Sequence, residues 1–125
     1  MSNLPQDVRK AWSERQAAVI LTTVDKKGTP NSIYATCVSK FNDSTLVIAD
    51  NYFNKTRQNI LNGSRASILF ITKSGKSYQI KGPVHYYSNG PIYKDMKQWN
   101  PEKHPGHAAV ALTVEEVYCG AQKLI

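Results

Sequence analysis

Hydrophobic residues along the chain form short runs separated by polar turns, a pattern typical of a protein built mainly from β-strands. The clearest case is the stretch 77–87, where Tyr78, Ile80, Val84 and Tyr86 point to one face and polar residues to the other. Such a period of two predicts a half-buried strand. Similar signals predict strands over 17–24, 31–41, 45–50, 65–72 and 108–118.

Three short helices are predicted between these strands. The first covers 4–15 and the third begins soon after residue 89, each with apolar residues three or four positions apart. The second covers 55–61, because Asn54 is a favourable N-cap residue and Gly63 a favourable residue to end a helix. We therefore expect a single domain over 1–125, with about six mostly antiparallel strands. A small closed barrel satisfies the strand edges best, and an open α+β sheet is the alternative.

Composition and charge narrow the class of protein without choosing its partner. Hydrophobic residues make up 41% of the 125 and charged residues 20%, which is ordinary for a globular protein and argues against disorder. The 16 basic and 9 acidic residues give a net charge of +7. That surplus is compatible with nucleic acid, an anionic cofactor or a soluble surface, and the basic residues form no dense run.

The absence of a membrane-spanning run, a secretory signal and closely spaced cysteines indicates the cellular location and the state of the thiols. No apolar run approaches the roughly 20 residues of a membrane-spanning helix, and the first residues do not resemble a secretory signal. We expect a cytoplasmic protein without a membrane partner. Cys37 and Cys119 lie far apart without metal-like spacing, so free thiols are expected, with one disulfide as the alternative.

The start of the second helix carries the best candidate for anion binding. A phosphate placed there would accept hydrogen bonds from unpaired backbone N–H groups, from the Thr56 hydroxyl and from the Lys55 ammonium. The alternative is that Asn54 only caps the helix while Lys55 and Arg57 are solvated. Neither GxGxxG nor GxxxxGK[ST] occurs in the sequence.

Several segments occur in an order that resembles a known family. The turn Asp25-Lys26-Lys27-Gly28-Thr29-Pro30 follows the first strand, Lys55-Thr56 precedes a helix, and the segment from Asn62 to Phe70 leads into the next strand. SYQIKGPV and VEEVY come later. Together they resemble the pyridoxamine 5′-phosphate oxidase-like FMN-binding split barrels over essentially the whole chain. The resemblance implies a mainly β fold with short helices, a six-stranded antiparallel, Greek-key-like split β-barrel.

The resemblance also implies where FMN binds. The strand over 32–37 would contact the isoalloxazine ring and the ribityl chain, with the end of the 45–50 strand beside it. These barrels are homodimers with FMN at the subunit interface, so a polar residue of the 77–87 strand would reach the flavin of the other subunit. A deazaflavin or haem in place of FMN is the alternative. The implied cofactor-binding residues are Ser32, Ile33, Tyr34, Ala35, Thr36, Cys37, Ala49, Asp50, Asn54, Lys55, Thr56, Ser77 and Gln79.

The leading functional hypothesis is a small FMN-binding flavoprotein, an oxidoreductase of unknown substrate. Genuine pyridoxamine phosphate oxidases have a longer C-terminal part, whereas this chain ends at Ile125 soon after the last strand. Asn54 stands where the family usually has a basic residue. Both departures argue against vitamin B6 oxidation, and we identify no catalytic acid or base.

Two other functions stay open at this point. The first is a non-catalytic FMN-binding electron carrier or flavin reservoir. The second is a basic β-barrel that binds single-stranded nucleic acid, suggested by the charge and by 10% aromatic residues. The 77–87 strand argues against nucleic acid, because its aromatic residues and Lys81 point to opposite faces.

Other chemistry-bearing residues have simpler interpretations. His104 and His107 have metal-like spacing, but no nearby Cys or helical HExxH supports them, so we expect no metal site and a solvated loop. Cys37 is interpreted as a small buried hydrophobe. Glu115 and Glu116 occupy adjacent strand positions and point to opposite faces, so they form no carboxylate pair.

Overall fold

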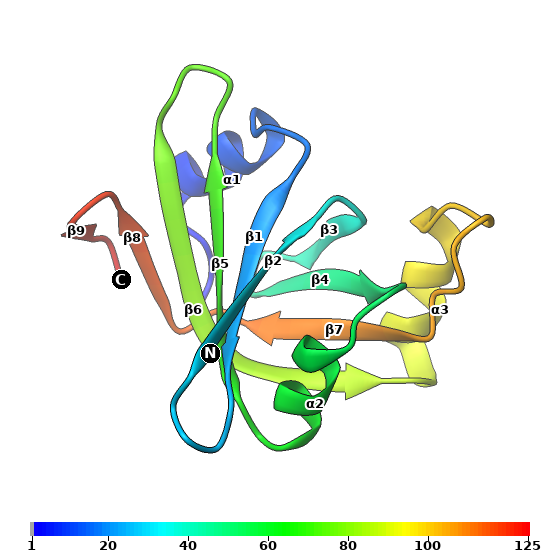
Figure 1. The fold of residues 1–125 in the computed structure, drawn as a ribbon. Coiled ribbons are helices and arrows are strands. Elements are labelled where there is room, and N and C mark those ends of the chain that lie inside the picture. The colour runs from blue at the N-terminus through cyan, green and yellow to red at the C-terminus, as the bar shows by residue number, and fades with distance from the viewer. Residues whose placement is uncertain (1) are drawn as a thin grey trace.

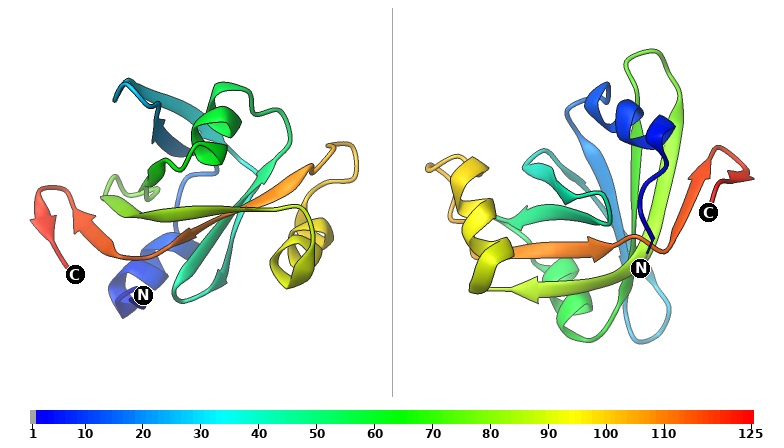
Figure 2. Two further views of the ribbon diagram at one scale, coloured as in Figure 1. Left: turned by 90° about the horizontal axis from the view of Figure 1, so that it is seen from below. Right: turned by 180° about the vertical axis from the view of Figure 1, so that it is seen from behind.

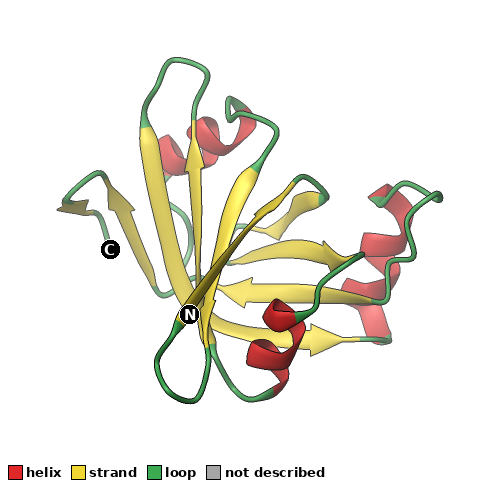
Figure 3. Cartoon of the chain, in the orientation of Figure 1, coloured by secondary structure: helices red, strands yellow, loops and turns green. Residues whose placement is uncertain are grey.

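The computed structural model describes residues 2–125, which form antiparallel strands and three helices (Figures 1 and 3). The elements in chain order are α1 (Gln6–Ser13), β1 (Val19–Val24), β2 (Pro30–Ala35), β3 (Val38–Asn42), β4 (Thr45–Asp50), α2 (Lys55–Leu61), β5 (Arg65–Ile71), β6 (Ser77–Tyr87), α3 (Gly90–Trp99), β7 (Ala108–Thr113), β8 (Glu116–Cys119) and β9 (Gln122–Lys123). Among the described residues, none of the helices is long and apolar enough to cross a membrane.

The strands form one strongly curled sheet in the order β2-β1-β5-β6-β7-β4-β3, with β8 and β9 added beside the first part of β6. The 11-residue strand β6 joins the two halves of this sheet. Residues 77–83 pair with β5, whereas residues 84–87 pair with β7. The strands β1 and β5 therefore cross the direction of β4 and β7, as Figure 3 shows.

The change of partner in β6 occurs at Gly82-Pro83, where the sequence predicts a bulge or an unpaired edge. A Cβ atom on Gly82 would lie 1.8 Å from the backbone oxygen of Thr113. Glycine is required there because β7 and its continuation pass directly against the β6 backbone. The close crossing allows one long strand to serve both halves of the barrel.

Two predicted strands are each divided in two, and the short strand β9 lies beyond the predicted ones, so residues 2–125 form nine strands where six are predicted. The predicted strand over 31–41 breaks at Thr36-Cys37, where the chain leaves β1 and turns to pair with β4. The predicted strand over 108–118 breaks between β7 and β8 in the same way. Both breaks lie where the curled sheet changes direction. The predicted fold class, a mainly β antiparallel split barrel with short helices, is confirmed.

Helix α1 closes one end of the barrel with the apolar face that the sequence predicts. Val8 and Trp12 are buried against the strands. The Trp12 ring meets the edge of Phe70 at a centroid distance of 5.1 Å, and Phe70 stacks on Tyr78 at 5.4 Å. These aromatic contacts fix the helix on the inner face of β5 and β6.

Strand β4 is buried on both faces, which makes it a rigid support for the residues that follow it. Leu46 and Ile48 belong to the barrel interior. Val47 and Ala49 belong to a second cluster on the opposite face, where Met96 of α3 covers them. Figure 2 shows α3 at one end of the molecule, beside β4 and β7, and its right-hand view, from behind, shows α1 in front of β1 and β5.

Candidate functional site

A cavity of about 450 Å³ lies where the edge strand β2, the end of β4 and the start of α2 meet. It opens at the break between β2 and β3. Predicted site residues from all three elements come together in its wall. The lining residues are Asn31, Ile33, Tyr34, Ala35, Thr36, Cys37, Ala49, Asn51, Tyr52, Phe53, Asn54, Lys55, Thr56 and His104.

Four predicted site residues lie elsewhere in the described part of the chain. The Ser32 hydroxyl is on the opposite face of β2, 2.7 Å from the Thr22 hydroxyl. The Asp50 side chain is buried behind the cavity wall. Ser77 and Gln79 lie on β6, where they pair with Ile71 and Leu69 of β5, and do not line this protomer's cavity.

The turn from Asp25 to Pro30 places a carboxylate beside Lys55. Asp25 Oδ1 accepts hydrogen bonds of 2.9 Å from the backbone N–H groups of Lys27 and Thr29. The bond from Thr29 is the main reason that the pKa of Asp25 lies below its ordinary value. The Lys55 ammonium is 3.9 Å from Asp25 Oδ2 and half exposed. This long, exposed contact is weak, so Lys55 can turn toward an anion in the cavity.

Helix α2 is attached to β1 and β2 by side-chain hydrogen bonds. Asn31 Nδ2 donates to Thr56 Oγ1 at 3.0 Å, and Asn59 Nδ2 donates to Thr23 Oγ1 at 3.0 Å. Thr56 and Asn59 are buried. Because the Thr56 oxygen accepts from Asn31, its own O–H remains a donor for a ligand.

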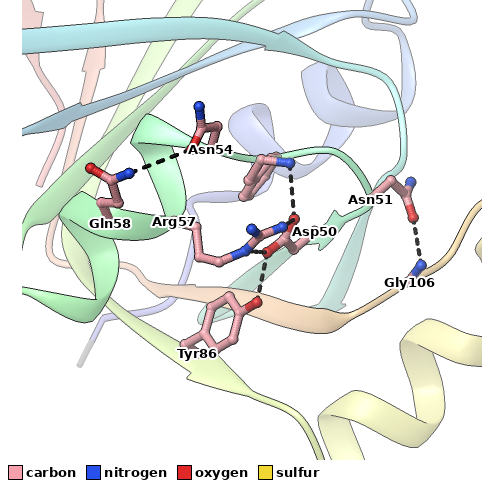
Figure 4. A network of polar contacts seen from close by, with 8 residues as sticks. Asp50, Asn51, Asn54, Arg57, Gln58, Tyr86 and Gly106 are labelled. Carbon is pink, nitrogen blue, oxygen red and sulfur yellow. Dashed lines mark hydrogen bonds and ion pairs between the residues drawn. The ribbon is translucent and has the colours of Figure 1, made fainter.

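The first turn of α2 also offers backbone donors. Asn54 occupies the N-cap position, as predicted, but within residues 2–125 no side chain forms a capping hydrogen bond there. Asn54 Oδ1 instead accepts from Gln58 Nε2 at 3.4 Å (Figure 4). The N–H groups that begin a helix have no intrahelical acceptor, and the residues at the start of α2, Asn54 to Thr56, all line the cavity.

The charge of the cavity wall favours an anion. Among the described lining residues, Lys55 is the ammonium group and no carboxylate is present. Ile33, Ala35, Ala49 and Phe53 supply apolar surface. The cavity therefore has an apolar wall and a cationic end, which is the arrangement that a flat apolar ring with an anionic substituent requires.

Behind the wall, the carboxylate of Asp50 accepts hydrogen bonds from three directions (Figure 4). Arg57 donates to both oxygens, with Nε at 2.7 Å from Oδ2 and Nη2 at 3.0 Å from Oδ1. Tyr86 Oη donates to Oδ2 at 2.6 Å, and the backbone N–H of Phe53 donates to Oδ1 at 3.0 Å. The sequence does not predict this cluster, and the alternative interpretation in which Arg57 is solvated does not hold.

The contacts among Asp50, Arg57 and Tyr86 shift the pKa of each of these side chains. Burial by itself raises the pKa of Asp50, but the hydrogen bonds from Arg57, Tyr86 and Phe53 outweigh it, so this pKa is lower than the ordinary value. The hydrogen bond to Asp50 raises the pKa of Arg57. Burial, followed by the bond to Asp50, raises the pKa of Tyr86. Asp50 and Arg57 are therefore a stable ion pair at neutral pH.

His104 reaches the mouth of the cavity from the loop after α3, which the sequence predicts as solvated. Its Nδ1 lies 3.0 Å from Tyr52 Oη, and the two rings meet edge to face at 5.5 Å. His104, Thr36 and Cys37 also line an adjoining cavity of about 400 Å³, together with Val38, Ser39, Trp99, Pro101 and Lys103. Among the described residues, no group of three or more His, Cys, Asp and Glu side chains is placed to hold a metal ion.

Five lining residues were absent from the prediction: Asn31, Asn51, Tyr52, Phe53 and His104. The first four adjoin predicted segments, so a broader window around each segment would have included them. His104 has no such signal. It reaches the cavity because its loop returns beside the end of β4, where the backbone N–H of His107 donates to Asp50 O at 2.9 Å.

Comparison of sequences shows a family relationship over nearly the whole chain. A family model described as pyridoxamine 5′-phosphate oxidase matches residues 5–119. An uncharacterised protein of Methanocaldococcus jannaschii is 31% identical over 106 residues, which cover 80% of this chain and 70% of that protein. A pyridoxine/pyridoxamine 5′-phosphate oxidase of Brucella canis is 32% identical over 103 residues, which cover 74% of this chain and 50% of the enzyme. The match therefore spans about half the length of the Brucella enzyme.

The same fold occurs in solved structures of proteins with different names. HupZ of Group A Streptococcus has a TM-score of 0.81 at 24% identity, covering 95% of this chain and 94% of that chain. An FMN-binding protein of Syntrophomonas wolfei has a TM-score of 0.72 at 16% identity, covering 90% and 94%. HutZ, described as a heme storage protein of Vibrio cholerae, has a TM-score of 0.69 at 16% identity, covering 94% and 95%. At these identities the likeness concerns the fold alone.

Proposed function

This chain belongs to the pyridoxamine 5′-phosphate oxidase family of split barrels, and we propose that it is an FMN-binding flavoprotein with oxidoreductase activity on a small substrate. The observation that carries the proposal is the cavity at the β2–β4–α2 junction. It combines an apolar wall with a single ammonium group, Lys55, and no carboxylate among its described lining residues. The FMN-binding protein of Syntrophomonas wolfei, which shares the fold, supports the choice of cofactor.

The α2 end of the cavity is suited to the phosphate of FMN. Lys55 would supply the counter-charge, and the Thr56 hydroxyl, oriented by Asn31, would donate a hydrogen bond. The backbone N–H groups of the first turn of α2 would complete the set of donors. All of these groups are donors, and the contact of Lys55 with Asp25 is weak enough to be exchanged for one with phosphate.

The opposite part of the cavity is suited to the isoalloxazine ring. Ile33, Ala35 and Ala49 provide small and branched apolar surface against which a flat ring can lie. The chain between β2 and β3, at Thr36-Cys37, belongs to neither strand and lines both cavities. FMN supplies hydride and electron chemistry when bound, while the protein orients the ring and tunes it. The adjoining cavity beside His104 would admit the substrate.

We also propose a homodimer that brings Ser77 or Gln79 of one subunit to the flavin of the other. Tyr34, Ile20, Leu69 and Gln79 occupy one row across β2, β1, β5 and β6, because each is the register partner of the next. Tyr34 is 77% exposed and Leu69 is 36% exposed. An exposed apolar row that begins at the cavity and ends at Gln79 is a suitable surface for a second copy.

A non-catalytic FMN carrier or reservoir is the second candidate function. It is favoured by the absence of a carboxylate among the described lining residues, which removes one class of general acid and base from the cavity wall. Vitamin B6 oxidation is not proposed, because the match spans about half of the Brucella oxidase.

Purification without added cofactor tests the proposal. Any bound chromophore is released and identified by mass, and the stripped protein is titrated with FMN. We expect FMN to be identified, or to bind the stripped protein tightly and raise its melting temperature. Recovery of haem or a deazaflavin, or no response to saturating FMN, would contradict the proposal. Turnover of reduced nicotinamide by the FMN-loaded protein supports the enzyme, and inertness toward donors and acceptors supports the carrier.

A further inference from the structure

The cluster of Asp50, Arg57 and Tyr86 lies behind the cavity wall and is connected to α2, whose first residues form the phosphate end of the cavity. Asp50 is the last residue of β4, and its side chain has no exposed surface. Arg57, which it binds, lies in α2 two residues after Lys55. We infer that Arg57 is a positioning residue for the phosphate end of the cavity, acting through Asp50. The inference rests on the proposed FMN-binding function.

The cluster determines where the cavity wall lies. Phe53, Asn54, Lys55 and Thr56 all line the cavity and lie between the two ends of the Asp50–Arg57 ion pair. The two-point contact from the guanidinium fixes the direction of the first turn of α2 relative to β4. The hydrogen bond from the Phe53 backbone N–H to Asp50 fixes the start of the same segment. The carboxylate of Asp50 therefore holds both ends of the segment from Phe53 to Arg57.

Two further elements meet at the same carboxylate. Tyr86 of β6 donates to Oδ2 from the second half of the sheet. The backbone oxygen of Asp50 accepts from His107, which places the loop that carries His104. Donors thus surround Asp50, whose carboxylate already accepts four hydrogen bonds and is not directed at a ligand. Its contribution to binding is the placement of its neighbours.

Arg57 also controls the electrostatic field at the phosphate end. The positive charge of Arg57 compensates the buried negative charge of Asp50. The electrostatic potential in the cavity is then positive, because Lys55 is the charged group among its described lining residues. Without Arg57, an uncompensated carboxylate would lie behind the wall that receives a dianionic phosphate. Loss of Arg57 therefore weakens phosphate binding in two ways, through displacement of Lys55 and Thr56 and through repulsion.

Binding of FMN and of riboflavin, which lacks the phosphate, tests this role. Arg57→Gln should weaken FMN binding by roughly tenfold, the lower end of the loss found at metal sites when residues that hold the metal ligands in place are removed. It should change riboflavin binding by less than about twofold, because the ring wall formed by β2 and β4 is intact. Arg57→Lys, which keeps the charge but loses the two-point contact, should fall between Arg57→Gln and wild type.

The matched control is Arg65→Gln, which removes an exposed ion pair between Arg65 and Glu115 outside the cavity. It should leave the affinities for FMN and riboflavin unchanged.

If Arg57→Gln does not fold, the same two affinities are measured for Arg57→Lys and Tyr86→Phe, since Tyr86→Phe removes a single donor to Asp50. Equal losses for FMN and riboflavin, or no loss for FMN, would overturn the positioning role. Failure of the wild-type protein to bind either compound would instead overturn the proposed function.

Discussion

Asn51 and Asn100 exchange two amide hydrogen bonds, each 3.0 Å long, although 49 positions separate them in the sequence. Both side chains are buried. Asn51 Oδ1 also accepts from the backbone N–H of Gly106 at 2.9 Å (Figure 4). A Cβ on Gly106 would lie 2.9 Å from Asn100 Nδ2, so glycine allows this close approach. The amide pair joins the cavity loop to the segment after α3.

Replacing Asn51 by alanine should lower the free energy of unfolding by about 2–3 kcal/mol, because the Asn100 amide and the Gly106 N–H would lose buried partners. Asn100→Ala should cost less, since Gly106 keeps its acceptor. Urea denaturation measures both values. Gln98→Ala, at an exposed position of α3, is the control and should be neutral. Equal stability of Asn51→Ala and wild type would show that the amide pair contributes nothing.

Lys55→Ala should weaken FMN binding by roughly 10- to 100-fold, the range expected when one charge-assisted hydrogen bond to phosphate is lost. Stability should not change, because Lys55 is half exposed and its contact with Asp25 is long. Fluorescence titration with FMN measures the affinity. Lys26→Ala, an exposed lysine of the neighbouring turn, serves as the control. Unchanged affinity in Lys55→Ala would place the phosphate elsewhere.

Asp50→Asn should destabilise the protein by about 2–3 kcal/mol near neutral pH, because Arg57 and Tyr86 lose a charged hydrogen-bond acceptor. The folded-state pKa of Asp50 is lower than its unfolded value, so its stabilisation is fully present above the ordinary aspartate pKa of about 3.9. It is lost as the pH falls through the lower folded-state pKa.

The stability difference between wild type and Asp50→Asn should therefore shrink as the pH falls from about 5 through the lower folded-state pKa of Asp50. Urea midpoints measured across this range test the sign. A difference that stays constant, or grows as the pH falls, would show that the ionised form of Asp50 is not the stabilising form.

Leu69→Glu should convert the proposed dimer to monomers and reduce FMN binding, since it places a charge in the exposed row that joins Tyr34 to Gln79. Sedimentation analysis reports the mass directly. Phe41→Glu is a matched control, because Phe41 is 37% exposed on β3, in the other half of the sheet, and Leu69 is 36% exposed. A monomeric wild type, or a Leu69→Glu variant that remains dimeric, would contradict the proposed interface.

Gly82→Ala should prevent folding or lower stability by more than about 3 kcal/mol, since the new methyl group overlaps the Thr113 backbone oxygen. Soluble yield and thermal melting measure the effect. Gly75→Ala is the comparison, because Gly75 has open space around it and a positive φ of 94°. It should cost only about 1 kcal/mol of backbone strain. A fully stable Gly82→Ala protein would mean that the two strands can separate at this crossing.

Much of the fold was predictable because its signals are local. The alternation over 77–87 predicted β6, and the apolar spacing over 4–15 predicted a helix that α1 confirms over Gln6–Ser13. The turn at Asp25 and the end of α2 at Gly63, with φ of 91°, are also as predicted, since one or two residues decide each conformation. The divided strands were missed, because nothing near Thr36 or Val114 shows where the sheet changes direction.

The candidate site was predictable to a similar degree. Lys55 and Thr56 were identified from the start of a short helix, and the residues of β2 from their order relative to the Asp25 turn. The roles of Asp50 and Arg57 were not, because a carboxylate at a strand end has the same local pattern whether it meets solvent, ligand or a guanidinium. Which of these it meets depends on how β4, α2 and β6 pack.

The sequence alone determined the mainly β class, the position of α2 and the cation at its start, because hydrophobic period, caps and turns act over a few residues. Only the tertiary structure decided that His104 reaches the cavity, that Asp50 is enclosed by donors from distant segments, and that Tyr34 and Gln79 share one row. These relationships depend on the curvature of the sheet at Gly82 and Thr36. That curvature results from the packing of all strands together, which no local pattern records.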